Sequence, residues 1–217
     1  MGRLRRSWFA AAAFALAATT LASAADLTRP QALAQLKEGG PPARRDAIAR
    51  LGEIGTMPDV QPLIQALRDP DEDVRARAER AIWQIWSRSG KPEVDALYRI
   101  GMDAVERGEL DKAIETFTQV IKLDPSFAEA WNKRATLHFL AGDLRKSLAD
   151  CDEVLKRNPQ HFGALAGYAQ IHLQLENYER ALAFARRALA VNPNLEGTRE
   201  LIEALEQLVE QRKGQQV

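Results

Sequence analysis

The sequence predicts an all-α protein in which helical hairpins stack into an α-solenoid. Three observations lead to this prediction. Pro125, Pro159 and Pro193 recur at a constant step, because 159 − 125 = 34 and 193 − 159 = 34. Small residues recur between them with the same step, and apolar residues on both sides follow the spacing of one helix face. A constant period in this range is typical of repeats that each bury an apolar face against the next.

Residues 1–24 are predicted to be a cleaved secretory signal peptide. Arg3, Arg5 and Arg6 form a basic head, residues 8–21 form an uncharged run of 14 residues, and residues 22–24 provide a small-x-small cleavage site. The run is shorter than the roughly 20 residues that span a bilayer, so we expect no stable membrane insertion after cleavage. The mature chain is then exported, with the periplasm as the expected location; secretion, or retention by an uncleaved N-terminal anchor, are the alternatives.

The next segment, residues 25–89, carries a second repeat pattern. Its apolar positions recur after 31 residues, as in the pair Ala47 and Ala78, since 78 − 47 = 31. Together with the acidic turn and Val-Arg of residues 69–75, this pattern resembles the HEAT family in its short-repeat form. The resemblance implies two helical pairs. Bilin attachment, which some short-repeat HEAT proteins accompany, does not carry over, because no residue here matches a catalytic role.

A short break in the helical pattern separates the two repeat regions. Residues 87–92 contain Gly and Pro, and we place the linker at residues 90–93. Trp83 and Trp86 lie just before it. Because the linker is short and two large aromatic residues adjoin it, we expect the two regions to pack together, with both tryptophans in the junction core.

Residues 94–195 divide into three repeats of equal length, 94–127, 128–161 and 162–195. Small residues recur at two positions of each repeat, where the helices of a hairpin face each other: Gly101, Ala135 and Ala169 at the eighth, and Ala113, Ser147 and Ala181 at the twentieth. This pattern, with its proline at the thirty-second position, resembles the tetratricopeptide repeat (TPR) family. The resemblance implies three helical hairpins whose first helices line a concave groove that holds a peptide or protein segment.

The turns of these repeats carry their own signals. Gly108 and Gly142 are predicted to end the first helices of their hairpins. The third repeat has no glycine there, and we expect Asn177 to adopt the left-handed conformation. Ser126 and Glu129 have the spacing of a capping box at the start of a helix.

The last segment, residues 196–217, is predicted to be a capping helix followed by a tail that frays after residue 213. Its helix spans residues 198–212 and has one apolar face, formed by Leu201, Ile202, Leu205, Leu208 and Val209. Stacked repeats need such a terminal helix with a polar outer face, because the last hairpin otherwise exposes its apolar side.

The TPR resemblance also implies the groove residues: Tyr98, Met102, Asn132, Thr136, Phe139, Gln170 and Leu173. Tyr98 and Phe139 are the expected aromatic anchors. In the alternative, Phe139 and Leu173 bury against the N-terminal helices or the final helix. The carboxylate clamp of chaperone-tail-binding TPR proteins is absent, because only Asn132 matches it. We therefore expect no recognition of a free C-terminal carboxylate.

The sequence shows no catalytic set, metal site or cofactor-binding motif. His138 and His172 occupy equivalent repeat positions without a recurring third ligand, so we assign them to helix packing. His161 follows a proline and is expected in a solvated loop. Cys151 is the only cysteine, so no disulfide forms within the chain, and we expect a buried, inert thiol.

Composition excludes one further class of partner. The chain has 30 basic and 30 acidic residues, and removal of the three signal arginines leaves 30 − 3 = 27 basic residues. This balance argues against nucleic acid, which requires a clustered basic surface.

We expect a non-enzymatic adaptor or scaffold of the cell envelope that binds a protein partner in the TPR groove. The alternatives are a structural subunit that docks by its outer faces or the HEAT/TPR junction and, more remotely, a metal-dependent or enzymatic role. The partner's identity and the oligomeric state stay open.

Overall fold

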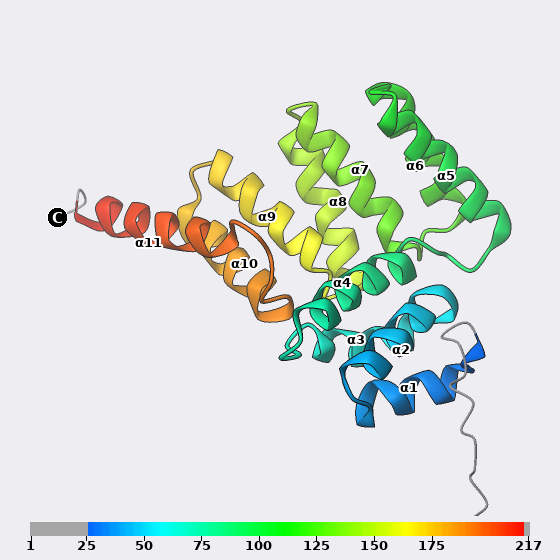
Figure 1. Ribbon diagram of the computed structural model, residues 1–217. Helices are drawn as coiled ribbons and strands as arrows, with labels where there is room; N and C mark the ends of the chain where they lie inside the picture. Colours follow the sequence, from blue (N-terminus) through cyan, green and yellow to red (C-terminus); the bar gives the residue numbers. More distant parts are fainter. Residues whose placement is uncertain (1–25, 215–217) are drawn as a thin grey trace, which may run out of the picture.

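The computed structural model describes residues 26–214, and this part of the chain is helical with no strand. The predicted signal peptide, residues 1–24, and the end of the tail lie outside the described residues. The all-α fold class is confirmed. Two groups of helices make up the molecule: an N-terminal unit, and three hairpins closed by a final helix (Figure 1).

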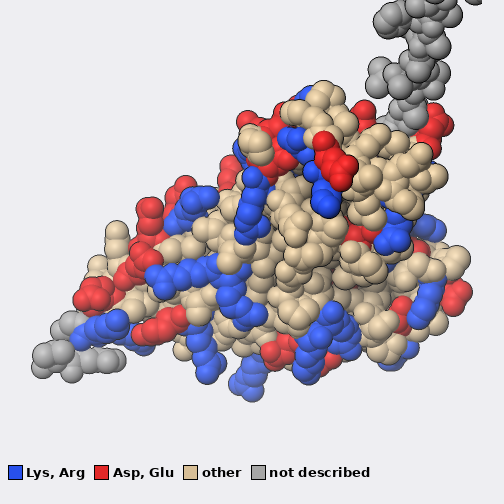
Figure 2. Space-filling model, turned by 90° about the horizontal axis from the view of Figure 1, so that it is seen from below, with Lys and Arg blue, Asp and Glu red and all other residues tan. Residues whose placement is uncertain are grey.

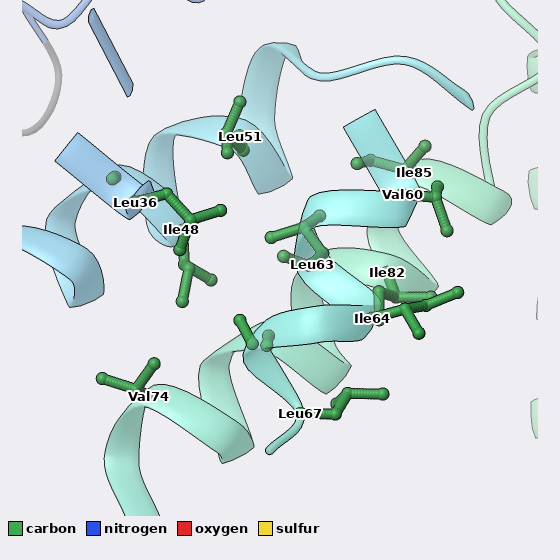
Figure 3. Packing of buried hydrophobic residues seen from close by; sticks show 14 of the residues in the cluster. Leu36, Ile48, Leu51, Val60, Leu63, Ile64, Leu67, Val74, Ile82 and Ile85 are labelled. Atoms are coloured by element: carbon green, nitrogen blue, oxygen red, sulfur yellow. The ribbon is translucent and has the colours of Figure 1, made fainter. Parts of the chain in front are cut away.

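The N-terminal unit comprises four α-helices and one short 3-10 helix: α1 (Arg29–Glu38), α2 (Pro41–Ile54), η2 (Met57–Asp59), α3 (Val60–Ala66) and α4 (Glu72–Trp86). Helix α2 packs against both α1 and α4, and α3 packs against α4. Its core joins Ile48 and Leu51 from α2 with Leu63 from α3 and Ile82 from α4 (Figure 3). All four side chains are fully buried, which supplies the main hydrophobic stabilisation of this unit. Its membership of the HEAT family stays a prediction.

The six helices that follow form three antiparallel hairpins: α5 (Pro92–Glu106) with α6 (Leu110–Leu123), α7 (Ala128–Leu140) with α8 (Leu144–Arg157), and α9 (Phe162–Gln174) with α10 (Tyr178–Val191). Each hairpin packs against the next through α6 and α7, and through α8 and α9. Helix α5 begins two residues before the predicted repeat boundary, because proline is well accommodated in the first turn of a helix.

The predicted close contacts within the hairpins are present. Ala113 and Ala181 are 0 % exposed and Ser147 is 1 % exposed. The Ser147 hydroxyl donates a 2.8 Å hydrogen bond to the carbonyl of Ala135 on the facing helix. A larger side chain at any of these positions would separate the two helices, because well-packed interiors lack space for additional atoms.

The predicted turn residue is confirmed in the first two hairpins and wrong in the third. Gly108 and Gly142 follow α5 and α7 with φ of 71° and 77°, as predicted. In the third hairpin the left-handed residue is Glu176, with φ of 55°, and Asn177 starts the next helix as its N-cap. The turn has the same geometry in all three hairpins. The residue that follows the first helix of the hairpin therefore adopts a positive φ even where it is a glutamate.

The predicted capping box is also wrong. The Ser126 hydroxyl donates to the carboxylate of Asp124 at 2.6 Å, and no side chain caps α7. Glu129 instead points into the interior, where it is 1 % exposed. Sequence spacing alone could not distinguish a capping glutamate from a buried one.

Helix α11 (Thr198–Gly214) covers the last hairpin. Leu205 and Val209 are buried in a cluster with Ala181 and Leu182 of α10. Leu201 and Ile202 pack at its edge. This apolar face is the one predicted from the sequence, and it shields α10 from water.

The N-terminal unit is followed in the chain by the first hairpin, but it also packs against the third hairpin. The Arg68 guanidinium donates to the carbonyls of Ala190 and Val191 at the end of α10. The Asn194 amide donates to the carbonyl of Leu67 at 2.8 Å. The chain thus folds back on itself, which places α4 beside the hairpins rather than only before them (Figure 1).

Charge is distributed without a dominant sign on the face shown in Figure 2, where basic and acidic side chains are interspersed around an uncharged central band. Within residues 26–214, no helix is both long and apolar enough to cross a membrane.

Candidate peptide-binding groove

Four of the seven predicted groove residues line one hollow between α7 and α9. Asn132, Thr136 and Phe139 come from α7 and Gln170 comes from α9, and the hollow measures about 60 Å³. Thr136 and Gln170 are exposed and Phe139 is half-buried. Asn132 is buried, and its amide donates to Glu129 at 3.1 Å. The spacing of the repeat therefore brings residues from two hairpins to one surface.

Tyr98 does not reach the groove surface, contrary to the prediction. It is 5 % exposed, and its ring packs against those of Phe117 and Phe127, with centroids 5.6 Å and 5.3 Å away. Burial raises the pKa of the Tyr98 hydroxyl, and the nearby Glu129 carboxylate adds to the effect. Tyr98 is thus part of the interior of the first hairpin, because its aromatic neighbours offer more apolar contact than solvent does.

The other predicted residues divide between packing and surface. Met102 is half-buried at the edge of the first hairpin's core. Leu173 packs against the cluster that contains Leu205 of α11, which is the alternative that the sequence left open. Phe139 packs with Ala135 and Ile171 between the second and third hairpins, so neither the N-terminal unit nor α11 covers it.

The other end of the groove is occupied by α4. The ring of Trp83 lies so close to Gly163 that a Cβ added there would stand 2.6 Å from Trp83 Cη2. The same ring contacts Phe162 edge-on at 5.2 Å, and Lys133 Nζ lies 5.7 Å from its centroid. Gly163 is the second residue of α9, and Lys133 lies midway along α7. The N-terminal unit therefore covers this end of the groove and borders the α7–α9 hollow, which Gly163 also lines.

His161 is the main residue that the sequence reasoning misplaced. It is 0 % exposed rather than solvated, and its ring stacks on Trp86 at 4.2 Å. Its Nδ1 accepts the backbone N–H of Ala164 at 3.1 Å and so caps the start of α9. The lone pair on Nδ1 assigns the proton to Nε2, which donates to Glu129 Oε2 at 2.8 Å.

Glu129 is the buried charge at the centre of this junction. Burial alone would raise the pKa of its carboxyl, but the hydrogen bond from His161 and the ammonium of Lys133 hold the pKa below its usual value. Lys133 Nζ lies 3.1 Å from Glu129 Oε1. No local motif predicts the pair, because Glu129 lies at the start of α7 and His161 lies 32 residues later at the N-cap of α9, so they meet only in the folded chain.

The remaining two histidines and the cysteine are buried among the packed helices. His138 Nε2 lies 3.9 Å from an oxygen of Asp150, and the ring of His172 stacks in parallel with that of Phe184. Among the described residues, no group of three or more His, Cys, Asp or Glu is placed to hold a metal ion. Cys151 is buried, and burial raises the pKa of its thiol to about 12.

Two family profiles match the hairpin region, and both are described as tetratricopeptide repeat. One covers residues 98–155 and the other covers residues 138–208. Together they span residues 98–208, which are 208 − 98 + 1 = 111 of the 217 residues.

The chain is a tetratricopeptide repeat protein.

Curated relatives include other TPR proteins and one lyase subunit. A TPR repeat-containing protein of Rhizobium etli is 33% identical over 129 residues, which are 59% of this chain and 63% of that protein. The alpha subunit of a phycocyanobilin lyase of Picosynechococcus is 38% identical over 72 residues, 33% of this chain and 27% of that protein. Tetratricopeptide repeat protein 36 of Bos taurus is 32% identical over 109 residues, 46% of this chain and 57% of that protein. This TPR protein thus spans less than two thirds of the length of each.

Solved structures share the helical fold of this chain. The first TPR of Spaghetti, bound to an HSP90 peptide, matches with a TM-score of 0.52 and 20% identity over 54% of this chain and 93% of that chain. The MamA protein matches with a TM-score of 0.52 and 15% identity over 73% of this chain and 87% of that chain. TPR domains are protein-interaction scaffolds, and the hairpin region of this chain is such a domain.

Proposed function

We propose that this TPR protein is a non-enzymatic adaptor that binds a peptide segment of a partner protein in the open part of its groove. The observation that supports this most directly is the hollow between α7 and α9, where Thr136, Phe139 and Gln170 from two hairpins share one surface. Helix α4 fills the opposite end of the groove. The partner segment therefore lies toward the ends of the first helices, not along their whole length.

The side chains around the open part define the chemistry of the partner. The Gln170 amide can donate to and accept from a peptide backbone, and the Thr136 hydroxyl, which donates to the carbonyl of Asn132 at 3.1 Å, can accept from one. Val105, Leu140 and Leu175 stand at the ends of α5, α7 and α9, and they are 36 %, 67 % and 41 % exposed. Exposed apolar side chains at one end of an array favour a segment with apolar anchors and neutral polar groups over a charged one.

A location in the cell envelope is part of this proposal. The basic head, the apolar run and the small-residue site of residues 1–24 support it. N-terminal sequencing of the protein purified from a cell that makes it is the direct measurement. We expect the mature chain to begin at Ala25, and a chain that retains Met1 in the cytosol would contradict the envelope location.

Site-specific photocrosslinking tests the groove. A benzophenone amino acid replaces Gln170 in the groove or, as a matched control, Gln119, which is exposed on the second helix of the first hairpin. We expect crosslinks to a partner from position 170, and their loss when Phe139→Ala is added. Crosslinks from position 119 alone would instead favour a structural subunit that docks by its outer faces.

A further inference from the structure

A second cavity lies at the junction between the N-terminal unit and the hairpins. It measures about 310 Å³ and shares no lining residue with the α7–α9 hollow. Its walls come from η2, the end of α4, the α6–α7 turn at residues 124–128 and the α8–α9 turn at residues 157–161. We call it the junction cleft. Ligand sites are common where two packed units meet, because neither unit alone fills the space between them.

Part of the junction cleft is apolar. The side chains of Met57, Trp86 and Phe127 line it. Trp86 and Phe127 are buried, whereas Met57 is 49 % exposed. An apolar side chain with this exposure beside two aromatic rings provides a surface that an aromatic or aliphatic group can cover.

The acidic groups of the junction cleft already have partners. Asp124 accepts the Ser126 hydroxyl at 2.6 Å and pairs with Lys91 Nζ at 3.0 Å. Glu129 is held by His161 and Lys133, as described above. These carboxylates are therefore compensated, and they leave little need for a cationic ligand.

Its nitrogen donors are less well satisfied. Trp86 Nε1 and Asn158 Nδ2 are buried and have no hydrogen-bond partner among the described residues, and Asn192 Nδ2, at the equivalent turn outside the cleft, shares this property. The side chains of Trp86 and Asn158 are 3 % and 7 % exposed. Arg88 donates to the carbonyls of Gly52 and Gly55 at 2.6 Å and 3.0 Å, but it forms no ion pair within residues 26–214. Buried donors without partners are uncommon, because each costs about 1–3 kcal/mol.

The geometry points to a binding site for a small carboxylate with an apolar body in the junction cleft. The carboxylate accepts from Asn158, Trp86 and Arg88, and the apolar body covers Met57 and Phe127. The volume equals that of about ten water molecules at roughly 30 Å³ each, which suits a molecule the size of benzoate. Charge-assisted hydrogen bonds are about twice as strong as neutral ones, so the anion gains more than its amide.

This site is independent of the peptide groove, and it has a structural consequence. Trp86 belongs to the N-terminal unit, whereas Asn158 belongs to the turn between the second and third hairpins. A ligand that contacts both holds the two units together. Because it binds only the folded chain, it raises the midpoint of thermal unfolding with its concentration.

Isothermal titration of the full chain with benzoate, and with benzamide as the neutral isostere, tests the site. The variant Asn158→Asp removes the donor and adds a negative charge. It retains the turn, because Asp124 occupies the equivalent position in the first hairpin and also accepts from the backbone two residues on. Asn192→Asp is the matched control: Asn192 caps the equivalent turn of the third hairpin and does not line the cleft.

We expect benzoate to bind and to raise the unfolding midpoint, and benzamide to bind about tenfold more weakly or not at all. Asn158→Asp and Arg88→Gln should each weaken benzoate binding by about tenfold or more, whereas Asn192→Asp leaves it unchanged. Three results would overturn the proposal: no benzoate binding, equal binding of benzoate and benzamide, or equal loss in Asn158→Asp and Asn192→Asp.

Discussion

Replacement of His161 by alanine removes a side chain that contacts the N-terminal unit, α7 and α9 at once. The imidazole is fully buried, donates to Glu129 at 2.8 Å, accepts from Ala164 at 3.1 Å and stacks on Trp86. Alanine can make none of these contacts. His161→Ala therefore leaves a buried carboxylate with fewer partners, an uncapped helix and a space beside an aromatic ring.

The expected loss of stability follows from these contacts. Removing one partner of a buried charge costs about 3–5 kcal/mol, and we take the lower end because Lys133 Nζ and the Asn132 amide stay 3.1 Å from Glu129. Losing the N-cap of α9 adds about 1 kcal/mol. The free energy of unfolding should thus fall by about 4 kcal/mol, which is a large part of the roughly 5–15 kcal/mol typical of a folded domain.

Urea unfolding at neutral pH, followed by circular dichroism, measures this change. If the buried charge of Glu129 causes most of the loss, Glu129→Gln in the His161→Ala background should restore about 2 kcal/mol, because a neutral amide costs less to bury than a carboxylate. A loss below about 1 kcal/mol in the single variant, or no recovery in the double variant, would refute this account of the junction.

Two further predictions concern the same region. Gly163→Ala should destabilise the protein by about 1–3 kcal/mol and increase the exposure of Trp83 to a fluorescence quencher, because the new Cβ would stand 2.6 Å from that ring. Gly167→Ala, also in α9, is the control: its Cβ would meet only Cys151 Sγ at 4.0 Å, so we expect no loss, and equal effects would contradict the proposed contact. Acid should weaken the protein through Glu129, whose pKa in the folded chain lies below its ordinary value of 4.5. Its contribution is fully present above pH 4.5 and disappears as the pH falls through the folded-state pKa, so stability measured against pH should fall more steeply below 4.5 in the wild type than in Glu129→Gln, and parallel curves would exclude this role.

The N-terminal unit changes how the TPR groove can be used. Trp83 and its neighbours occupy the end near the starts of α7 and α9, and Trp86 is 3 % exposed beneath His161. A partner that docks at this junction must displace contacts within the chain. A partner at the Phe139 end of the α7–α9 hollow meets no such obstacle, so we place the peptide there.

Much of the fold was predictable because it follows from residue size and spacing. The period of the prolines located the hairpins, and Ala113, Ser147 and Ala181 are buried where two helices meet. The apolar face of α11 was visible as helical spacing. The groove was predictable only in part, since repeat position places a residue on a helix face but does not say what covers that face. Phe139 and Gln170 line the hollow, whereas Tyr98 is covered by its own hairpin.

The sequence by itself determined the helical hairpins, their order and the small-residue contacts within them, since these depend on neighbours within one or two repeats. Only the tertiary structure decided that the chain folds back, that Glu129 and His161 meet in the interior, and that α4 closes one end of the groove. These features join residues far apart in the chain. Their contacts depend on how helices from different parts of the chain pack against one another, and no local spacing encodes that packing.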